Sequence, residues 1–321
     1  MRIADISGGL GNQMFQYIFG RYLEESTGEK VFFDDSYFFH TSDATDENKK
    51  LQNEINTSGV HNGYELEYVF PYATKPSLLS NFFTPDIWGH MLNEAKNGTS
   101  IEVQLRNGGV PDLKILHEMP SPNELDLYTA NNIEVLRTPP NAFNSGLSKI
   151  QGNIYYKGYW INPSYLNSYK DVILKDLTFR PLEDEQNIQY AKAITDSECA
   201  VGVHIRRGDF VTIGWALNES YYSAQVKKIL KTVPNTTFFV FSDQIDWCKQ
   251  NRRKLGLPKT SVFVEGNFDY KNNYIDMQLM AMCNMLIVGR SSFSYLASLI
   301  NRVDGFVPIQ TRIVDLNDVA E

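Results

Sequence analysis

The second half of this chain alternates between strand-like and helix-like patterns, and this alternation limits the folds open to it. Short apolar runs predict buried strands at 200–205, 237–241, 261–264 and 285–288. Segments with helical spacing separate or flank them, at 183–197, 220–231, 244–255, 274–283 and 293–301. Strands that alternate with helices form a parallel sheet covered on both faces. The pattern therefore predicts an α/β fold.

The first half begins in the same way but soon becomes less regular. Residues 2–6 predict a strand, which a glycine-rich turn joins to apolar residues at helical spacing from Met14 to Leu23. From about 40 to 150 the segments are short and weakly periodic, and we expect an irregular half-domain there. Because the pattern becomes cleaner after Pro181, we place two domains at 1–180 and 181–321.

An aromatic run at 155–160 is rich in strand-forming residues, and a helix is expected after it, from Pro163 to about Leu177. The aromatic rings fit two interpretations: they stack in a core, which we favour, or they contact a sugar. The cysteines Cys199, Cys248 and Cys283 are too few and too dispersed for a disulfide framework or a zinc site, so we expect them to pack in the core.

The chain of 321 residues carries a formal charge of −8, with a pI near 5.3. This balance argues against a nucleic-acid-binding protein, which normally presents a broad basic face. Met1 leads directly into the first strand pattern, without a basic leader or a run long enough to span a bilayer. We expect a cytoplasmic protein, either free or peripheral to the inner face of a membrane.

The strand at 200–205 ends in a cluster of charged and polar residues. His204 offers a ring nitrogen, Arg206 and Arg207 carry donors that suit phosphate oxygens, and Asp209 follows. A pyrophosphate fits such a cluster. A solvated turn in which Asp209 only pairs with an arginine fits it as well, because charge clusters mark both sites and structural ion pairs.

Polar residues also follow the other strands, and ligands of open α/β sheets bind outside the carboxyl ends of the strands. Asp243 follows the strand at 237–241. Ser291 and Ser292 follow the strand at 285–288, where the helix near Phe293 exposes free backbone N–H groups that suit a phosphate. The alternative for the two serines is a simple helix cap, which is compatible with an anion site.

Asp276 lies at the start of an apolar helix, where its carboxylate stabilises the positive end of the helix dipole or accepts hydrogen bonds from a guanine. The glycine-rich turn at 8–12 matches neither the dinucleotide fingerprint nor a P-loop. The chain has no Asp-x-Asp motif, a common metal-binding motif of sugar-nucleotide enzymes. We therefore expect no metal and no cofactor, with pyrophosphate charge met by arginine and the helix dipole.

Taken together, these motifs resemble glycosyltransferase family 11, whose members are mostly α-1,2-fucosyltransferases. The matching stretches occur in order along the chain, at 8–17, 204–210, 239–243, 276–283 and 291–294. The resemblance implies a GT-B fold, with two Rossmann-like domains facing a central cleft. It implies that the N-terminal domain shapes the acceptor side and that the C-terminal domain binds GDP-β-L-fucose. The chain departs from the family pattern at Arg290, Gln244 and the pair Tyr295-Leu296.

Carried over by position, the resemblance implies a role for each matching residue. Arg206 binds the pyrophosphate, with Arg207 and Asp243 beside it, and His204 and Asp276 read the guanine. The phosphate and nucleotide pocket is lined by Ser291, Ser292 and Phe293. Asn12 approaches the fucose and positions it.

The reaction implied is an inverting, metal-independent transfer of L-fucose to a hydroxyl, O2 of a galactose in an oligosaccharide or polysaccharide. Asp209 is the nearest carboxylate to the arginine pair and is either the general base or, as we favour, an ion-pair partner. Acceptor contacts are expected from roughly 34–160. The alternatives are a relative with another GDP-sugar or linkage and a catalytically silent nucleotide-sugar-binding protein.

Overall fold

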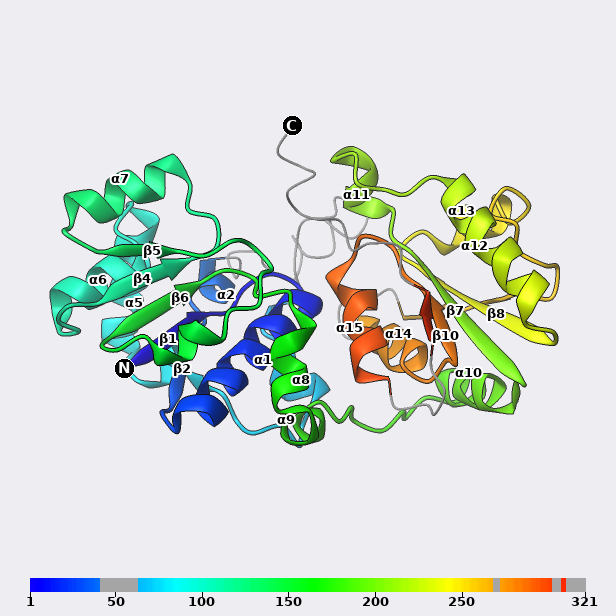
Figure 1. Ribbon diagram of the computed structural model, residues 1–321, viewed down its shortest axis with the longest axis horizontal. Coiled ribbons are helices and arrows are strands. Elements are labelled where there is room, and N and C mark those ends of the chain that lie inside the picture. The colour runs from blue at the N-terminus through cyan, green and yellow to red at the C-terminus, as the bar shows by residue number, and fades with distance from the viewer. Residues whose placement is uncertain (41–62, 268–271, 302–306, 310–321) are drawn as a thin grey trace. The chain divides into compact units, whose positions relative to one another are not determined.

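A computed structural model describes residues 1–40, 63–267, 272–301 and 307–309. The described residues fall into two compact units, each with its own parallel sheet, and the division lies after Thr178 (Figure 1). The two α/β units confirm the predicted fold class. Their arrangement around a cleft stays a prediction.

The first unit is built on a six-stranded sheet with the order β3-β2-β1-β6-β4-β5. Its strands, all paired in parallel, are β1 (Arg2–Asp5), β2 (Val31–Asp34), β3 (Ser77–Leu78), β4 (Lys114–His117), β5 (Val135–Arg137) and β6 (Ile154–Lys157). Its helices are α1 (Leu10–Thr27), α2 (Tyr37–His40), α4 (Leu66–Val69), η1 (Leu79–Asn81), α5 (Pro85–Lys96), α6 (Ile101–Gly108), α7 (Pro122–Ala130), η2 (Ser145–Lys149), α8 (Pro163–Ser168) and α9 (Lys170–Asp176).

The helix α1 is a large part of the core of this unit, because nearly all of its first four turns are buried. Gly8, with φ of 72°, makes the tight turn from β1 into the helix. Phe19 of α1 stacks on Trp160, with ring centroids 4.1 Å apart and planes at 10°. Tyr155, Tyr156 and Trp160 are buried, which confirms the core interpretation for most of the aromatic run, whereas Tyr159 is 43% exposed.

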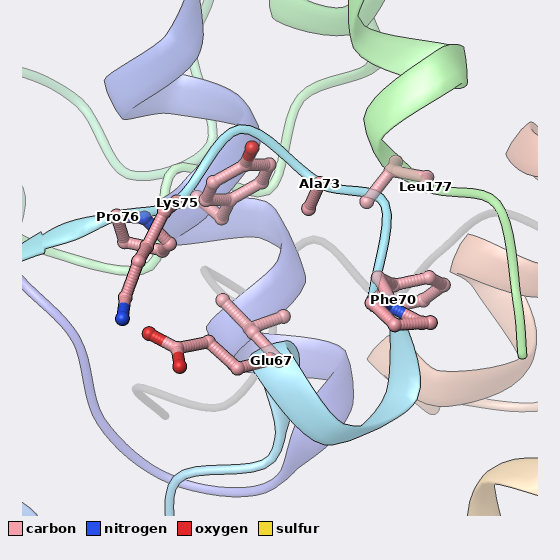
Figure 2. A pocket seen from close by; sticks show the side chains of 9 residues that line it. Glu67, Phe70, Ala73, Lys75, Pro76 and Leu177 are labelled. Carbon is pink, nitrogen blue, oxygen red and sulfur yellow. The ribbon is translucent and has the colours of Figure 1, made fainter.

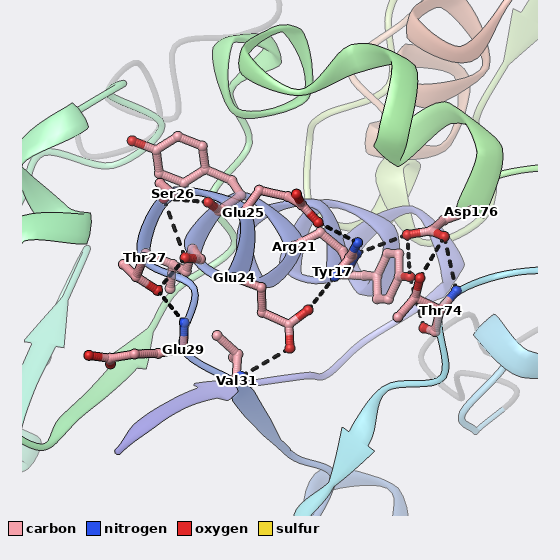
Figure 3. A network of polar contacts seen from close by, with 12 residues as sticks. Tyr17, Arg21, Glu24, Glu25, Ser26, Thr27, Glu29, Val31, Thr74 and Asp176 are labelled. Atoms are coloured by element: carbon pink, nitrogen blue, oxygen red, sulfur yellow. Dashed lines mark hydrogen bonds and ion pairs between the residues drawn. The ribbon is translucent and has the colours of Figure 1, made fainter.

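A buried polar network joins α1 to the end of α9 (Figure 3). The Asp176 carboxylate accepts hydrogen bonds from the Tyr17 hydroxyl at 2.9 Å and from Arg21 Nε at 2.9 Å. It also accepts the backbone N–H of Thr74 at 3.0 Å. A buried charge is tolerated only when it is paired and hydrogen-bonded. The network therefore ties α1, α9 and the segment before β3 together.

The second unit has a five-stranded sheet with the order β11-β10-β7-β8-β9. Its strands, again paired in parallel, are β7 (Cys199–Ile205), β8 (Thr236–Ser242), β9 (Val262–Phe263), β10 (Met285–Ile287) and β11 (Val307–Ile309). Its helices are α10 (Glu185–Asp196), α11 (Gly208–Thr212), α12 (Glu219–Thr232), α13 (Ile245–Gln250), α14 (Asn273–Met280) and α15 (Ser292–Ile300).

Three expectations from the sequence need correction. The region from 40 to 150 is not an irregular half-domain where it is described, because α5, α6 and α7 alternate there with β4 and β5. The helix expected at 163–177 is broken at Tyr169, whose φ of −138° and ψ of 43° are not helical. The helix expected at 244–255 ends at Gln250 and continues as turns.

The cysteines Cys248 and Cys283 are buried, as expected, and Cys199 is half-buried. In the part of the chain that the structure describes, none of the helices combines the length and the apolar character needed to cross a membrane.

Candidate functional site

The predicted cluster follows β7, the strand at which the strand order of the second sheet reverses. Its neighbour β8 and then β9 lie on one side, and β10 and β11 lie on the other, so the strand order reverses at β7. Open α/β sheets bind ligands in the crevice outside such a reversal. The carboxyl ends of β7 and β10 are therefore the expected binding place in this unit.

Arg206 is held by two carboxylates just past the end of β7. Its Nη2 lies 2.9 Å from Asp209 Oδ1, and its Nη1 lies 3.0 Å from Asp243 Oδ2. Its Nε also donates to Asp209 at 3.1 Å. A guanidinium has about five N–H donors, so about two remain for an external ligand. The structure thus shows the ion pair that the sequence left as one interpretation of Asp209.

Asp243 is a support for the arginine pair. Its side chain is 7% exposed, and it accepts the backbone N–H of Arg207 at 2.9 Å while it pairs with Arg206. Burial raises the pKa of this carboxyl, and the charge of Arg206 opposes that rise. Asp243 therefore connects β8 to the loop after β7.

Arg207 packs against α13. Its guanidinium carbon lies 3.5 Å from the centroid of the Trp247 ring, and its Nε donates to Gln244 at 3.2 Å. Stacking of this kind is favourable for arginine. Sequence reasoning missed Trp247, and no local pattern marks it. The predicted contact of Arg207 with a nucleotide stays a prediction.

The start of α15 differs from that of an ordinary capped helix. Ser291 occupies the N-cap position, but its side chain makes no capping hydrogen bond, and the first turn contains no acidic residue. The Tyr295 N–H donates to Ser291 O, so the helical ladder begins only there. A helix that starts in this way offers backbone N–H groups and a positive dipole end to an anion. The simple-cap interpretation of Ser291 is therefore wrong.

His204 lies against this helix start. Its ring centroid is 5.9 Å from that of Phe293, in the first turn of α15. The histidine is 6% exposed, and among the described residues its buried Nδ1 has no hydrogen-bond partner. Burial, and after it the charge of Arg206, lowers the pKa of His204 to about 3, so the ring is neutral. Buried polar atoms are nearly always paired, and at this edge of the sheet a ligand could supply the missing partner.

Asp276, in the first turn of α14, belongs to a buried polar network. Its Oδ1 accepts from Asn267 Nδ2 at 2.8 Å, and Asn267 exchanges two hydrogen bonds with Asn187, at 2.8 and 2.9 Å. Burial raises the pKa of Asp276 to about 7, and the Asn267 hydrogen bond opposes the rise. Sequence reasoning missed Asn187 and Asn267, which lie 80 positions apart.

Asn12 lies in the first unit, in the first turn of α1. Its backbone N–H donates to Gly9 O at 2.9 Å. Its predicted contact with the transferred sugar stays a prediction. Within the ranges that the structure describes, no group of three or more His, Cys, Asp or Glu residues could hold a metal ion.

A pocket of about 200 Å³ opens elsewhere in the first unit. Its lining is mainly apolar, with the charged ends of Glu67 and Lys75 on one side and Phe70 and Leu177 on the other (Figure 2). None of the residues predicted from the sequence lines this pocket. We assign it no ligand.

Comparison with known proteins now adds to this geometry. The model of the family described as "Glycosyl transferase family 11" matches residues 141–317, more than half of the chain. An α-1,2-colitosyltransferase of Escherichia coli is 30% identical over 48% of this chain, and the match spans only 54% of that relative. The O-antigen biosynthesis glycosyltransferase WbnK of the same species is 23% identical, over 96% of this chain and 92% of the relative.

Among solved structures, the fucosyltransferase NodZ from Bradyrhizobium is similar with 13% identity and a TM-score of 0.48. That similarity covers 93% of this chain and 92% of NodZ.

Proposed function

The chain belongs to glycosyl transferase family 11, and from this premise we propose that it transfers L-fucose from GDP-β-L-fucose to O2 of a galactose residue. We propose further that the transfer inverts the anomeric centre and needs no metal. The relative WbnK takes part in O-antigen biosynthesis, by its name, so we propose a bacterial surface polysaccharide or its oligosaccharide precursor as the acceptor.

One observation carries the donor proposal: the start of α15, where Ser291 gives no side-chain cap, lies beside His204, whose buried Nδ1 has no hydrogen-bond partner among the described residues. The positive end of the helix dipole suits a phosphate, and the His204 ring lies 5.9 Å from that of Phe293 in the first turn. Arg206 follows His204 by two residues at the same sheet edge. Such a set suits a nucleoside diphosphate. We place the diphosphate at the helix start and Arg206, and the base nearer His204 and Asp276.

The mechanism follows from the charges that develop during transfer. When the bond between the anomeric carbon and the phosphate oxygen breaks, negative charge grows on the departing GDP. Arg206 is already oriented by Asp209 and Asp243, so its remaining donors can meet that charge without rearrangement. A preorganised donor of this kind is typically worth ~3 kcal/mol in the transition state, or about a hundredfold in rate.

We assign Asp209 to positioning. Its carboxylate is already committed to Arg206 through two contacts to the same oxygen. A base must be able to leave its resting partner and reach the acceptor hydroxyl. We therefore propose that Asp209 orients Arg206.

A second donor is favoured by one observation, the 30% identity to an α-1,2-colitosyltransferase. L-Colitose is L-fucose without the hydroxyl at carbon 3, so one GDP site can serve both sugars. Purified protein incubated with lactose and, in turn, GDP-fucose, GDP-colitose and GDP-mannose distinguishes these donors. We expect transfer from GDP-fucose with an α-1,2 linkage by NMR. Transfer from GDP-colitose alone favours the second donor, and binding of GDP-fucose without transfer identifies a silent binding protein.

A further inference from the structure

Two buried asparagines connect three segments of the second unit next to the Asp276 carboxyl. Asn187 lies in α10, Asn267 follows β9, and Asp276 lies in the first turn of α14. Asn187 is 4% exposed and Asn267 is 3% exposed. Buried amides are unfavourable unless their donors and acceptors are paired. The hydrogen bonds of this pair therefore determine how both side chains are oriented.

The Asp184 carboxylate fixes the orientation of Asn187. An ionised carboxylate only accepts hydrogen bonds, so the Asn187 atom that lies 2.9 Å from Asp184 Oδ2 must be the amide nitrogen, Nδ2. The other Asp184 oxygen accepts the backbone N–H of Asn187 at 2.8 Å and caps α10. The Asn187 side chain therefore presents its second N–H and its carbonyl oxygen to Asn267.

Asn187 in turn leaves Asn267 with one orientation. Asn187 Nδ2 donates to Asn267 Oδ1 at 2.8 Å, and Asn267 Nδ2 donates to Asn187 Oδ1 at 2.9 Å. The second N–H of Asn267 donates to Asp276 Oδ1 at 2.8 Å. An amide has two N–H donors, so those of both asparagines are fully used. This chain of hydrogen bonds begins and ends at a carboxylate, and it requires that Oδ1 of Asp276 carry no proton.

The segment that carries Asn267 also contacts α10 through its backbone. Gln186 Nε2 donates to Glu265 O at 3.4 Å, and the Tyr190 hydroxyl donates to Phe263 O at 3.4 Å. The helix α10 packs in addition against α14. The position of Asn267 relative to Asp276 is therefore set by α10 and by the loop after β9 together.

The anchored Asp276 carboxyl suits the edge of a guanine. Asn267 engages one lone pair of Oδ1, and among the described residues no second hydrogen bond to this carboxyl is found. Asp276 is only half-buried. A guanine offers an N1–H and an amino N–H side by side, and the two oxygens of a carboxylate match this pair of donors. Hypoxanthine lacks the amino group, and adenine lacks the N1 hydrogen.

We propose that Asn267 is a positioning residue for base recognition, because it fixes the direction of the Asp276 carboxyl, and that Asn187 holds Asn267 in the orientation this requires. The inference rests on the proposed function, which places the guanine of the donor near Asp276. It adds that the choice of guanine over other bases depends on α10 and the loop after β9 as well as on α14. All of these residues belong to the second unit.

The electrostatics of Asp276 agree with this role. Burial raises the pKa of Asp276, and the hydrogen bond from Asn267 opposes the rise. Loss of Asn267 would raise the pKa further and favour the neutral carboxyl. A neutral carboxyl has a hydroxyl that donates, so it matches the two donors of a guanine less well. Asn267 therefore acts on both the direction and the charge of Asp276.

The test measures the Kd of GDP and of inosine diphosphate (IDP) by calorimetry at pH 8, where most of the wild-type Asp276 carboxyl is charged. IDP carries hypoxanthine and differs from GDP only by the missing amino group. We expect the wild-type protein to prefer GDP by roughly tenfold or more, because IDP lacks one hydrogen bond to a charged group. We expect Asn267→Ala to reduce this preference by about threefold or more, mainly through weaker binding of GDP.

Asn187→Ala is the second variant, because it leaves the Asn267 side chain in place with one partner fewer. We expect a smaller decrease of the GDP preference in the same direction. This variant decides the question if circular dichroism shows that Asn267→Ala does not fold.

Asn284→Ala is the matched control. Asn284 Oδ1 accepts the N–H of Ala200 at 2.8 Å, near the amino end of β7 and therefore away from the carboxyl ends of the strands. The substitution removes a structural amide from the same unit. We expect it to leave the ratio of GDP to IDP affinity unchanged even if the melting temperature falls.

A double-mutant cycle tests whether Asn267 acts through Asp276. We expect Asp276→Asn alone to reduce the preference for GDP, because an amide offers one acceptor oxygen in place of two. Adding Asn267→Ala to Asp276→Asn should then change the preference little, since residues that act through one contact are not additive. An undiminished effect of Asn267→Ala in that background would overturn the inference.

Folded Asn267→Ala and Asn187→Ala proteins that keep the wild-type ratio of GDP to IDP affinity would overturn this inference and leave the proposed function standing. Equal losses for both nucleotides, matched by Asn284→Ala, would also overturn it, because they indicate a general loss of stability. A wild-type protein that binds neither GDP nor GDP-fucose would overturn the inference and the proposed function together.

Discussion

The rings of His204 and Phe293 lie 5.9 Å apart and join the end of β7 to the first turn of α15. This contact brings together residues 89 positions apart in the sequence (293 − 204). It places a buried, unpaired nitrogen beside an uncapped helix start.

Replacement of Arg206 tests the charge on the leaving group. We expect Arg206→Ala to lower kcat about a hundredfold, because one preorganised donor is worth ~3 kcal/mol in the transition state. The fold should persist, since Arg206 is 35% exposed. Steady-state kinetics and circular dichroism measure the two effects. Arg253→Ala, at an exposed arginine of the same unit, is the control and should leave both unchanged; equal losses in the two variants would contradict the assignment.

Replacement of Asp209 separates positioning from proton transfer. We expect Asp209→Asn to lower activity at every pH by a similar factor, because Arg206 loses one anchor. The measurement is kcat/KM as a function of pH. Loss of the pH-dependent limb in this variant would show that Asp209 itself takes the proton.

A charge placed at the start of α15 should compete with the diphosphate. We expect Ser291→Asp to stabilise the helix by about 1 kcal/mol, because Asp is a good N-cap, and to weaken GDP binding by tenfold or more. Ser291→Asn caps the same N–H groups without charge and should weaken binding less. Thermal melting and calorimetric titration with GDP test both variants, and equal GDP affinity in Ser291→Asp and wild type would argue against the anion site.

From the raised pKa of Asp276 we expect nucleotide binding to depend on pH. Its pKa is raised to about 7, so it is charged above that pH and neutral below it. A guanine that donates two hydrogen bonds needs the charged form, and GDP should therefore bind more weakly as the pH falls from 8 to 6. GDP itself titrates in this range, so the informative quantity is the difference from Asp276→Asn. Parallel curves for the two proteins would exclude Asp276 from base recognition.

Packing behind the site predicts a stability effect at Gly202 in β7. A Cβ there would lie 2.4 Å from Cδ2 of Leu286 in β10. We expect Gly202→Ala to lower the free energy of unfolding by ~1–3 kcal/mol, because a filled core must rearrange to admit a methyl group. Gly89→Ala in α5 meets open space and should stabilise by roughly 0.5–1 kcal/mol. Urea denaturation compares them, and equal midpoints would contradict this account.

Local pattern was sufficient to predict most of the second unit, but not α11 or β11. Its strands are short apolar runs, and its helices carry regular spacing, so β7, β8 and β10 and the polar residues after them could be predicted in order. The first unit was harder because α7 lacks a strong apolar period and because β3 and β5 are only two and three residues long. The starts of α5 and α7 were nevertheless marked, by Thr84 before Pro85 and by the capping box of Ser121 and Glu124.

Other parts of the site depend on tertiary contacts that no local pattern records. The stacking of Arg207 on Trp247 depends on the orientation of α13, and the pair Asn187–Asn267 joins two distant segments. Sequence shows which side chains are available, whereas the tertiary structure decides which of their atoms are already engaged.

The grip of Asp209 and Asp243 on Arg206 has a consequence for turnover. Arg206 and Arg207 carry two positive charges, which Asp209 in the same loop and Asp243 after β8 balance before any ligand binds. An anion that binds there meets oriented hydrogen-bond donors, and when it dissociates it leaves no uncompensated positive charge. Its affinity therefore depends on hydrogen-bond geometry more than on net charge, which suits an enzyme that must release its nucleotide product in every cycle.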